Sequence, residues 1–381
     1  MPPLFLYGTL RHPPLLAAVS GSDALSGVAA TLADHTIAHA VGTDGVVQSF
    51  PLFAERPGAQ ALGLLIRPDA AARARLDAYE RAFGYDTSSI TVQTADGPVE
   101  AAIYLPQAAL WRPGPKWSLA DWVKTHGALT VETAGEVMAL LPHTPPEAVR
   151  ARYRMLEMRV SSRWRAQADP APTTLRRQPS PGDVTIAARD APYVRFFGVD
   201  EADLRFRRFD GTMSASVKRA AFVMSDAVTV LPYDPVRDTV LVIEQFRFGP
   251  MTRGAPNCWS LEPIAGRIDP HETPEQALRR ETREEAGIEL GALLPIAGYY
   301  PSPAAVSEFL YSYVGLADLE AGQGGLGGLE SEAEDIRTHV IPFDRLMAVV
   351  DSGEVQNGPL LLSAFWLARH RDALRREHAP G

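Results

Sequence analysis

The stretch GRIDPHETPEQALRRETREEAGI, Gly266 to Ile288, determines how the C-terminal half of the chain folds. Thr273, followed by a proline, can cap a helix, and Gln276 three residues later completes a capping box. Gly287 supplies a C-terminal stop. The pattern therefore predicts a helix from Thr273 to Ala286.

Three glutamates of this helix, Glu281, Glu284 and Glu285, stand at i, i+3 and i+4 and so share one face. Like charges at this spacing destabilise a helix by about 0.2–0.5 kcal/mol per pair, so a cation should offset them. Mg²⁺ suits such a site, because it binds a few carboxylates together with substrate phosphates. Alternatively, the neighbouring arginines simply neutralise an exposed helix. These arginines are Arg279, Arg280 and Arg283.

The spacing resembles the Nudix box, G-x5-E-x7-R-E-U-x-E-E-x-G-U, in which U is apolar. Its fixed positions fall on Gly266, Glu272, Arg280, Glu281, Glu284, Glu285, Gly287 and Ile288. The one departure is Thr282, where an apolar residue is usual. Because Thr282 follows the line of Leu278 and Ala286, it leaves the carboxylate face unchanged.

Further segments resemble the ADP-ribose pyrophosphatase branch of the Nudix hydrolases, which implies an α/β fold with an α/β/α sandwich. These segments are WSLEPIAG before the box, YYPSPAAVSEF after it and EAEDIRTHVIP further on. Ala304 and Ala305 replace glycines common in that branch, as in Nudix proteins linked to tellurite resistance.

This resemblance implies roles for individual residues. Glu281 and Glu285 would bind the metal ion, assisted by Glu284 and the Ala265 carbonyl. The expected metal is Mg²⁺, with Mn²⁺ as the alternative. Gly266, Glu272, Arg280 and Gly287 would shape the loop and helix. The substrate contacts implied are Arg247, its partner Glu244, and Glu308.

The resemblance also implies the catalytic base and the reaction. A glutamate in the acidic loop would deprotonate water, with Glu334 the better match and Glu332 the second. Attack on one phosphorus would split ADP-ribose, or a related nucleoside diphosphate sugar, into AMP and ribose 5-phosphate. A homodimer that exchanges its N-terminal strands is expected. The alternative is a scaffold that senses nucleotides without turnover.

The N-terminal segment carries weaker signals. LFLYGTL predicts a strand followed by a turn at Tyr7, Gly8, Thr9 and Leu10, whose backbone N–H groups suit an anion. With LDAYERAFGYD and AAIYL, the order resembles the γ-glutamylcyclotransferase-like fold, a small barrel. The resemblance makes Glu80 the acid/base that closes a γ-glutamyl amine to 5-oxoproline. Two interpretations of this domain stay open. Either Glu80 is catalytic, or Arg81 lowers the pKa of Glu80 and the domain has only a structural role.

Composition sets the outer limits. The 381 residues suffice for two or three domains. We expect a γ-glutamylcyclotransferase-like domain over 1–110, a helical extension over 111–166, a proline-rich linker over 167–190 and the Nudix domain over 191–381. A net charge of −9 argues against nucleic acid as a partner. The single cysteine, the absence of a signal-like N-terminus and the lack of long apolar runs predict a cytoplasmic protein without membrane contact.

Overall fold

The computed structural model describes residues 1–106, 111–169, 171–194, 197–320, 324–329 and 333–379. The chain divides into two compact units. One consists mainly of Met1–Trp164, and the other mainly of Arg165–Pro192 and Phe197–Gly381.

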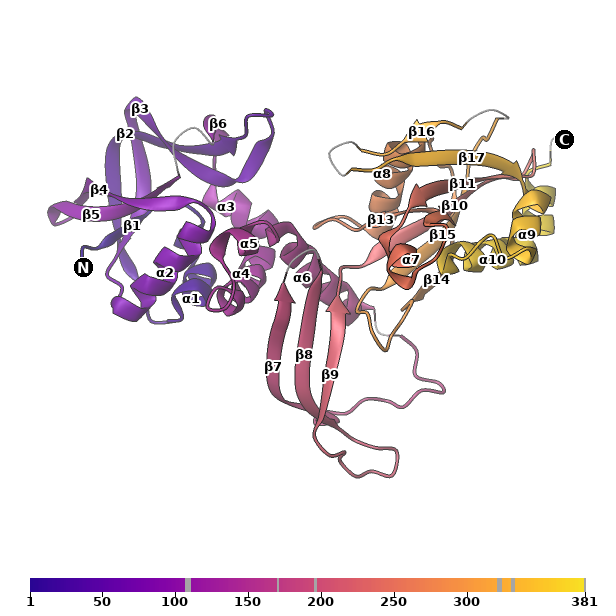
Figure 1. The fold of residues 1–381 in the computed structure, drawn as a ribbon. Coiled ribbons are helices and arrows are strands. Elements are labelled where there is room, and N and C mark those ends of the chain that lie inside the picture. Colours follow the sequence, from indigo (N-terminus) through magenta and orange to yellow (C-terminus); the bar gives the residue numbers. More distant parts are fainter. Residues whose placement is uncertain (107–110, 170, 195–196, 321–323, 330–332, 380–381) are drawn as a thin grey trace. The chain divides into compact units, whose positions relative to one another are not determined.

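The first unit is built on a closed five-stranded barrel, as the sequence predicted (Figure 1). Around the ring the order is β3-β1-β5-β4-β2, and β2 pairs again with β3. Only the β1–β5 pair is parallel. The strands are β1 Leu4–Leu6, β2 Gly27–Val41, β3 Val47–Ile66, β4 Tyr85–Thr94, β5 Gly97–Pro106 and, added beside β2, β6 Arg112–Lys116.

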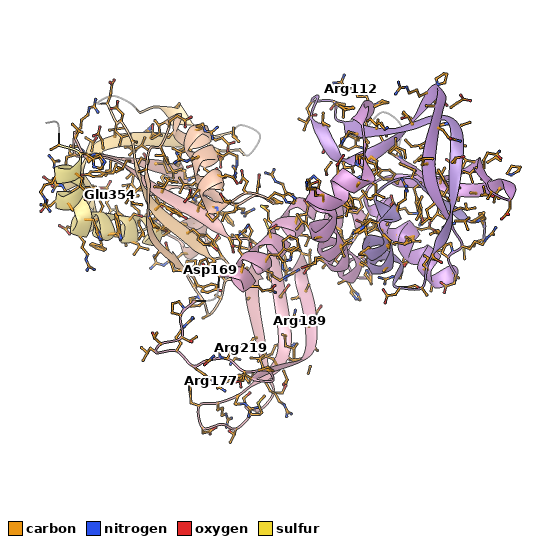
Figure 2. The ribbon with its side chains drawn as sticks, turned by 180° about the vertical axis from the view of Figure 1, so that it is seen from behind. Arg112, Asp169, Arg177, Arg189, Arg219 and Glu354 are labelled. Carbon is orange, nitrogen blue, oxygen red and sulfur yellow. The ribbon has the colours of Figure 1, made fainter. Side chains whose placement is uncertain are left out.

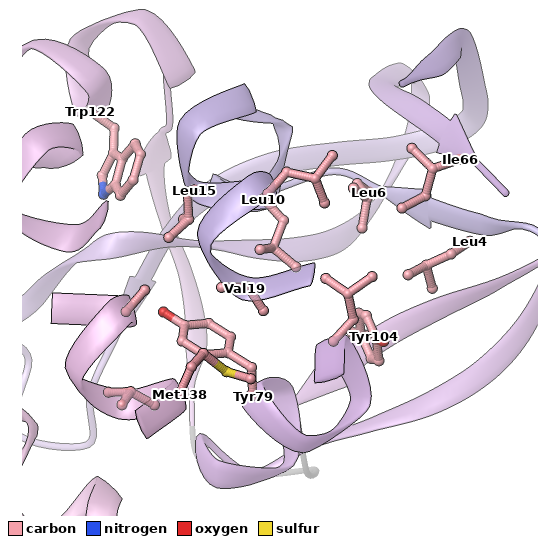
Figure 3. Packing of buried hydrophobic residues seen from close by; sticks show 14 of the residues in the cluster. Leu4, Leu6, Leu10, Leu15, Val19, Ile66, Tyr79, Tyr104, Trp122 and Met138 are labelled. Carbon is pink, nitrogen blue, oxygen red and sulfur yellow. The ribbon is translucent and has the colours of Figure 1, made fainter. Parts of the chain in front are cut away.

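Helices close one side of this barrel. The predicted helical extension packs into the same core, because Trp122 and Met138 join Leu15 and Val19 in one buried cluster (Figure 3). The extension differs from the expectation at its start, where β6 pairs with β2 instead of forming a helix. The helical elements are η1 Thr9–Arg11, α1 Pro13–Ser20, α2 Ala70–Ala82, α3 Leu119–Trp122, η2 Val123–Gly127, α4 Ala128–Leu140, α5 Pro146–Arg150 and α6 Tyr153–Ala168.

The second unit contains an eight-stranded mixed sheet. Its main order is β14-β15-β10-β11-β17-β16, with β12 added to β11 and β13 added to β10. The strands are β10 Ala227–Asp234, β11 Thr239–Phe246, β12 Trp259–Glu262, β13 Ile264–Arg267, β14 Leu293–Tyr299, β15 Leu310–Leu316, β16 Leu326–Gly327 and β17 Ile336–Pro342.

Helices cover both faces of this sheet, which confirms the predicted sandwich. Side chains alternate along β10, so Val230 packs in the cluster that includes Leu278 of α8, whereas Leu231 packs in the cluster that includes Leu346 of α9 and Leu367 of α10. The helices of this unit are α7 Phe248–Arg253, α8 Pro274–Ala286, α9 Phe343–Asp351 and α10 Gly358–Glu377.

A separate three-stranded sheet precedes the sandwich in the sequence. Its strands are β7 Val184–Val194, β8 Gly198–Phe206 and β9 Val217–Val223, in the order β7-β8-β9. Strand β7 begins within the range predicted as a linker. Side chains such as Arg189 on β7 and Arg219 on β9 are exposed (Figure 2). None of the helices described here is long and apolar enough to cross a membrane.

Candidate functional site

Helix α8 begins and ends where the sequence predicted. The Thr273 side chain accepts a hydrogen bond from the Gln276 backbone N–H at 3.2 Å, and the Gln276 side chain accepts one from the Thr273 N–H at 2.9 Å. Such a cap stabilises a helix by about 1 kcal/mol. Gly287 ends the helix in the left-handed region, with φ +65°. Thr282 is buried and donates its hydroxyl to the Leu278 carbonyl at 2.8 Å, so the departure from the usual apolar residue leaves no unpaired polar group.

Arg280 joins most of the charged residues of the predicted box. Its guanidinium donates two hydrogen bonds of 3.0 Å to the Glu272 carboxylate. It also donates to Glu281 at 2.7 Å, to Glu284 at 3.1 Å and to the Arg267 carbonyl at 3.0 Å. Arg280 therefore ties the loop before α8 to the carboxylate face of the helix.

Glu285 is the most buried carboxylate of α8, with 2% of the residue exposed. Burial, followed by the nearby charge of Glu281, raises the pKa of Glu285 to about 9, although the Ala265 N–H donates to this carboxylate at 3.3 Å. Gly266 lets Glu281 approach, because a Cβ at this glycine would lie 1.9 Å from the Glu281 Cδ. The close contact between β13 and α8 therefore leaves the carboxyl groups of Glu281 and Glu285 crowded together.

Arg247 lies beside these carboxyls and is held by Glu262. Its Nη2 and Nε donate to the Glu262 carboxylate at 2.8 and 3.1 Å. Glu262 is buried, whereas 44% of the Arg247 side chain is exposed, so the Arg247 cation stays accessible from solvent.

The predicted pairing of Arg247 with Glu244 is wrong. Side chains alternate between the faces of the sheet along β11. Arg247 directly follows this strand and continues its pairing, because its N–H donates to the Cys258 carbonyl at 2.8 Å, so residues 244 and 247 point to opposite faces. Glu244 instead lies 2.9 Å from the His339 Nε2. The sequence analysis missed Glu262, although it is the glutamate of WSLEP and stands opposite Ile243 in the β11–β12 pair.

Two further predicted residues lie near this cluster. The Glu334 carboxylate accepts a hydrogen bond from the Leu329 N–H at 3.2 Å, and its charge contributes to the raised pKa of Glu285. Burial raises the pKa of Glu308, while Arg267 and Arg247 oppose that shift. The alternative base, Glu332, lies outside the described residues.

The donor set on α8 is chemically suited to a hard divalent cation. Glu281 and Glu285 offer carboxylate oxygens, and Ala265 offers a neighbouring carbonyl. In the described part of the chain, no group of three or more His, Cys, Asp or Glu residues is already gathered as a metal site. Crowded carboxyls with a raised pKa nevertheless favour a cation between them. The metal-binding roles remain predictions.

The first unit holds a separate cavity of about 350 Å³. The predicted turn residues Tyr7, Gly8, Thr9 and Leu10 line it, and so does Glu80 of α2. Thr9 and Leu10 belong to the short helix η1, and Tyr7 and Gly8 connect it to β1. The structure thus brings the predicted loop and the predicted acid/base to one cavity.

Burial raises the pKa of Glu80 to about 8. Arg81 is exposed to solvent, so the predicted lowering of this pKa by Arg81 is wrong. On a helix, successive residues point in different directions, and the positive charge of Arg81 is hydrated outside the cavity. Glu80 in turn raises the pKa of Tyr7 and Tyr85, behind the larger effect of burial on each ring.

Comparison with known proteins identifies both units. The NUDIX domain family matches residues 224–361, and the family described as gamma-glutamyl cyclotransferase, AIG2-like, matches residues 4–124. The ADP-ribose pyrophosphatase of Escherichia coli K12 is 38% identical over 198 residues, covering 52% of this chain and 93% of that protein.

Two other relatives extend the likeness. An ADP-ribose pyrophosphatase of Haemophilus influenzae is 32% identical over 49% of this chain and 86% of its own length. A GDP-mannose pyrophosphatase of Enterobacter sp. strain 638 is 32% identical over 39% of this chain and 77% of its own length. The chain therefore belongs to the Nudix hydrolases and carries an AIG2-like γ-glutamyl cyclotransferase domain ahead of its Nudix domain.

Proposed function

We propose that the second unit hydrolyses the diphosphate bond of ADP-ribose, or of a related nucleoside diphosphate sugar, to AMP and ribose 5-phosphate. The observation that carries this proposal is the meeting of crowded carboxyls on α8 with the half-exposed guanidinium of Arg247. Such a site combines ligands for a cation with a positive group for a phosphate. The names of the relatives support the substrate class.

In this mechanism Glu281, Glu285 and the Ala265 carbonyl would hold Mg²⁺, with Glu284 assisting and Mn²⁺ as the alternative. When bound, the metal polarises diphosphate oxygens and screens their charge. Arg247, fixed by Glu262, binds a phosphate and orients it. Glu334 accepts the proton of the attacking water.

A substrate panel tests the proposal. ADP-ribose and GDP-mannose, each supplied with Mg²⁺, are compared by kcat/KM, and the nucleotide products are separated chromatographically. We expect AMP from ADP-ribose and a higher kcat/KM for this substrate, because the ADP-ribose pyrophosphatase relative has the higher identity and coverage. Preference for GDP-mannose would overturn the assignment of ADP-ribose as the substrate. It would leave the proposed hydrolysis of a nucleoside diphosphate sugar unchanged.

We also propose a homodimer in which the β7–β9 sheet meets a second copy of the chain. Apolar side chains of this sheet are exposed, including Ile186 at 43% and Phe222 at 49%. An exposed apolar surface of this kind is typical of an interface. Light scattering after gel filtration should give twice the chain mass, and a monomer would contradict the proposal. The predicted cytoplasmic location stays a prediction.

A second activity is favoured by the cavity of the first unit. There, Glu80 would take a proton from the α-amino group of a γ-glutamyl amine as its nitrogen attacks the γ-carbonyl carbon. The bond from that carbon to the amine nitrogen then breaks, Glu80 returns the proton to the leaving amine, and 5-oxoproline forms. Its pKa of about 8 is the specific observation, because an acid/base works best when its pKa lies near the operating pH. Chromatographic detection of 5-oxoproline from a γ-glutamyl amine tests this activity.

A further inference from the structure

The last turn of helix α6 lies outside both family matches, which cover residues 4–124 and 224–361. Arg165 stands in this turn and belongs to the second unit. Its Nε donates to the Asp226 carboxylate at 2.7 Å, and both side chains are largely buried, with 18% of Arg165 and 7% of Asp226 exposed. Removing one partner of a buried ion pair leaves the charge of the other to act on its surroundings.

Asp226 lies on the sheet face that carries the proposed metal site. It directly precedes β10, and its carbonyl accepts the Ile268 N–H at 3.2 Å, which continues the pairing of β10 with β13. Because side chains alternate along a strand, Asp226 shares a face with Val228, two residues further on. Val228 stands opposite Gly266 and packs in the cluster that includes Leu278 of α8. The Asp226 carboxylate therefore lies on the α8 side of the sheet.

The loop that carries Glu308 is joined to the same segment of backbone. The Met224 N–H donates to the Ser307 hydroxyl at 2.9 Å, and this hydroxyl donates to the Met224 carbonyl at 3.1 Å. On the other side of Glu308, the Phe309 carbonyl accepts the Ala227 N–H at 3.0 Å. Both neighbours of Glu308 are thus bonded to the segment that leads into β10.

Electrostatic effects also connect Asp226 with Glu308. Burial raises the pKa of Glu308, Arg267 lowers it, and the charge of Asp226 raises it again. The Tyr311 ring of β15 responds to both members of the ion pair. After the larger effect of burial, Asp226 raises the pKa of Tyr311 and Arg165 lowers it. The charge of Asp226 therefore reaches a predicted substrate contact, and Arg165 carries the opposite charge.

We propose that Arg165 is a positioning residue of the hydrolase site, which offsets the charge of Asp226 and so lowers the repulsion that the substrate diphosphate meets there. This inference rests on the hydrolysis proposed above. Without Arg165, more of the negative charge of Asp226 would act on Glu308 and on the substrate phosphates. The end of the helical extension thereby becomes part of the hydrolase site, although it lies outside the NUDIX match.

Steady-state kinetics of the full chain with ADP-ribose and Mg²⁺ test this role. Arg165→Gln should raise KM about tenfold, which corresponds to about 1.4 kcal/mol, because repulsion weakens substrate binding. It should leave kcat within about twofold, since Arg165 touches neither the substrate nor the attacking water. Arg165→Lys keeps the positive charge and should restore most of the affinity.

Changes at Asp226 separate charge from packing. Arg165→Gln combined with Asp226→Asn removes both charges and should return KM to within about twofold of the unmodified value. Asp226→Asn alone should lower KM, because the positive charge of Arg165 remains, and this variant decides the question if Arg165→Gln does not fold. The matched control is Arg163→Gln on the same helix, where Arg163 pairs with Glu136 of α4. This control should leave KM and kcat unchanged.

Three outcomes would overturn the role of Arg165 and leave the proposed hydrolysis intact. These are an unchanged KM in Arg165→Gln, an equal rise of KM in the single and double variants, and a rise of KM in Asp226→Asn. An equal rise would mean that the contact acts through packing alone, since removal of the second charge would not restore binding. If the unmodified chain releases no AMP from ADP-ribose, the proposed hydrolysis fails, and the role of Arg165 fails with it.

Discussion

The two units both place glutamates in poorly solvated positions, yet they surround them with different groups. Glu281 and Glu284 of α8 share the guanidinium of Arg280 with Glu272, which precedes the helix, and Arg247 lies next to Glu285. In the N-terminal cavity, phenol and other aromatic rings line the space around Glu80 and Glu157. The first setting favours a cation and a phosphate, whereas the second favours transfer of a proton. The neighbours of a glutamate, rather than its burial, thus decide its chemistry.

The largest effect is expected on α8. Glu281→Gln should lower ADP-ribose hydrolysis by at least about 100-fold, because even indirect supports of a metal are worth 10–100-fold. Fold is checked by circular dichroism. The matched control is Glu289→Gln, which changes a side chain that is 76% exposed and should leave hydrolysis unchanged. Near-normal turnover by Glu281→Gln would refute the metal assignment.

A smaller effect separates the observed partner of Arg247 from the predicted one. Glu262→Gln weakens a charged, buried contact and should lower kcat/KM for ADP-ribose about tenfold, mainly through KM. Glu244→Gln, on the other face of β11, should change kcat/KM less than twofold. Steady-state kinetics of the two variants make the comparison, and equal effects would contradict the pairing seen in the structure.

The two sites should also work independently. Glu80→Gln should abolish formation of 5-oxoproline and leave ADP-ribose hydrolysis within about twofold, because Glu80 serves only the cavity of the first unit. Both products can be measured in one reaction mixture. Loss of both activities in the Glu80→Gln variant would contradict the independence of the two sites.

The smallest effect concerns stability. Because the pKa of folded Glu80 is about 8, against an ordinary value of 4.5, the folded chain keeps a proton that the unfolded chain releases between these pH values. Stability from the neutral carboxyl is therefore complete below pH 4.5 and is lost as pH rises toward 8. Relative to Glu80→Gln, the wild-type melting temperature should fall by about 4–10 °C between pH 5 and pH 8. A constant difference between the two proteins would argue against the raised pKa.

Local sequence signals predicted much of this structure. The capping box of Thr273 and Gln276 and the stop at Gly287 set the limits of α8, and both appear as expected. Turn chemistry of this kind acts over a few residues, so it is readable without tertiary structure. The short apolar segments around Phe5 and Ile103 likewise form barrel strands.

Contacts between distant strands were harder to predict. Glu262 pairs with Arg247 because β12 lies antiparallel to β11, and only that register brings them to one face. Glu157 enters the cavity of Glu80 because α6 packs on the barrel, 77 residues further along the chain. The exposure of Arg81 also depends on how α2 is rotated, which the sequence pattern did not settle.

Metal-dependent release of AMP tests the central claim most directly. The full chain is incubated with ADP-ribose in Mg²⁺ and, separately, after chelation of divalent cations, and the products are resolved chromatographically. We predict AMP and ribose 5-phosphate with Mg²⁺ and neither after chelation. Equal product formation in both samples, or no product from ADP-ribose in either, would contradict the account of α8 as a metal-dependent hydrolase site.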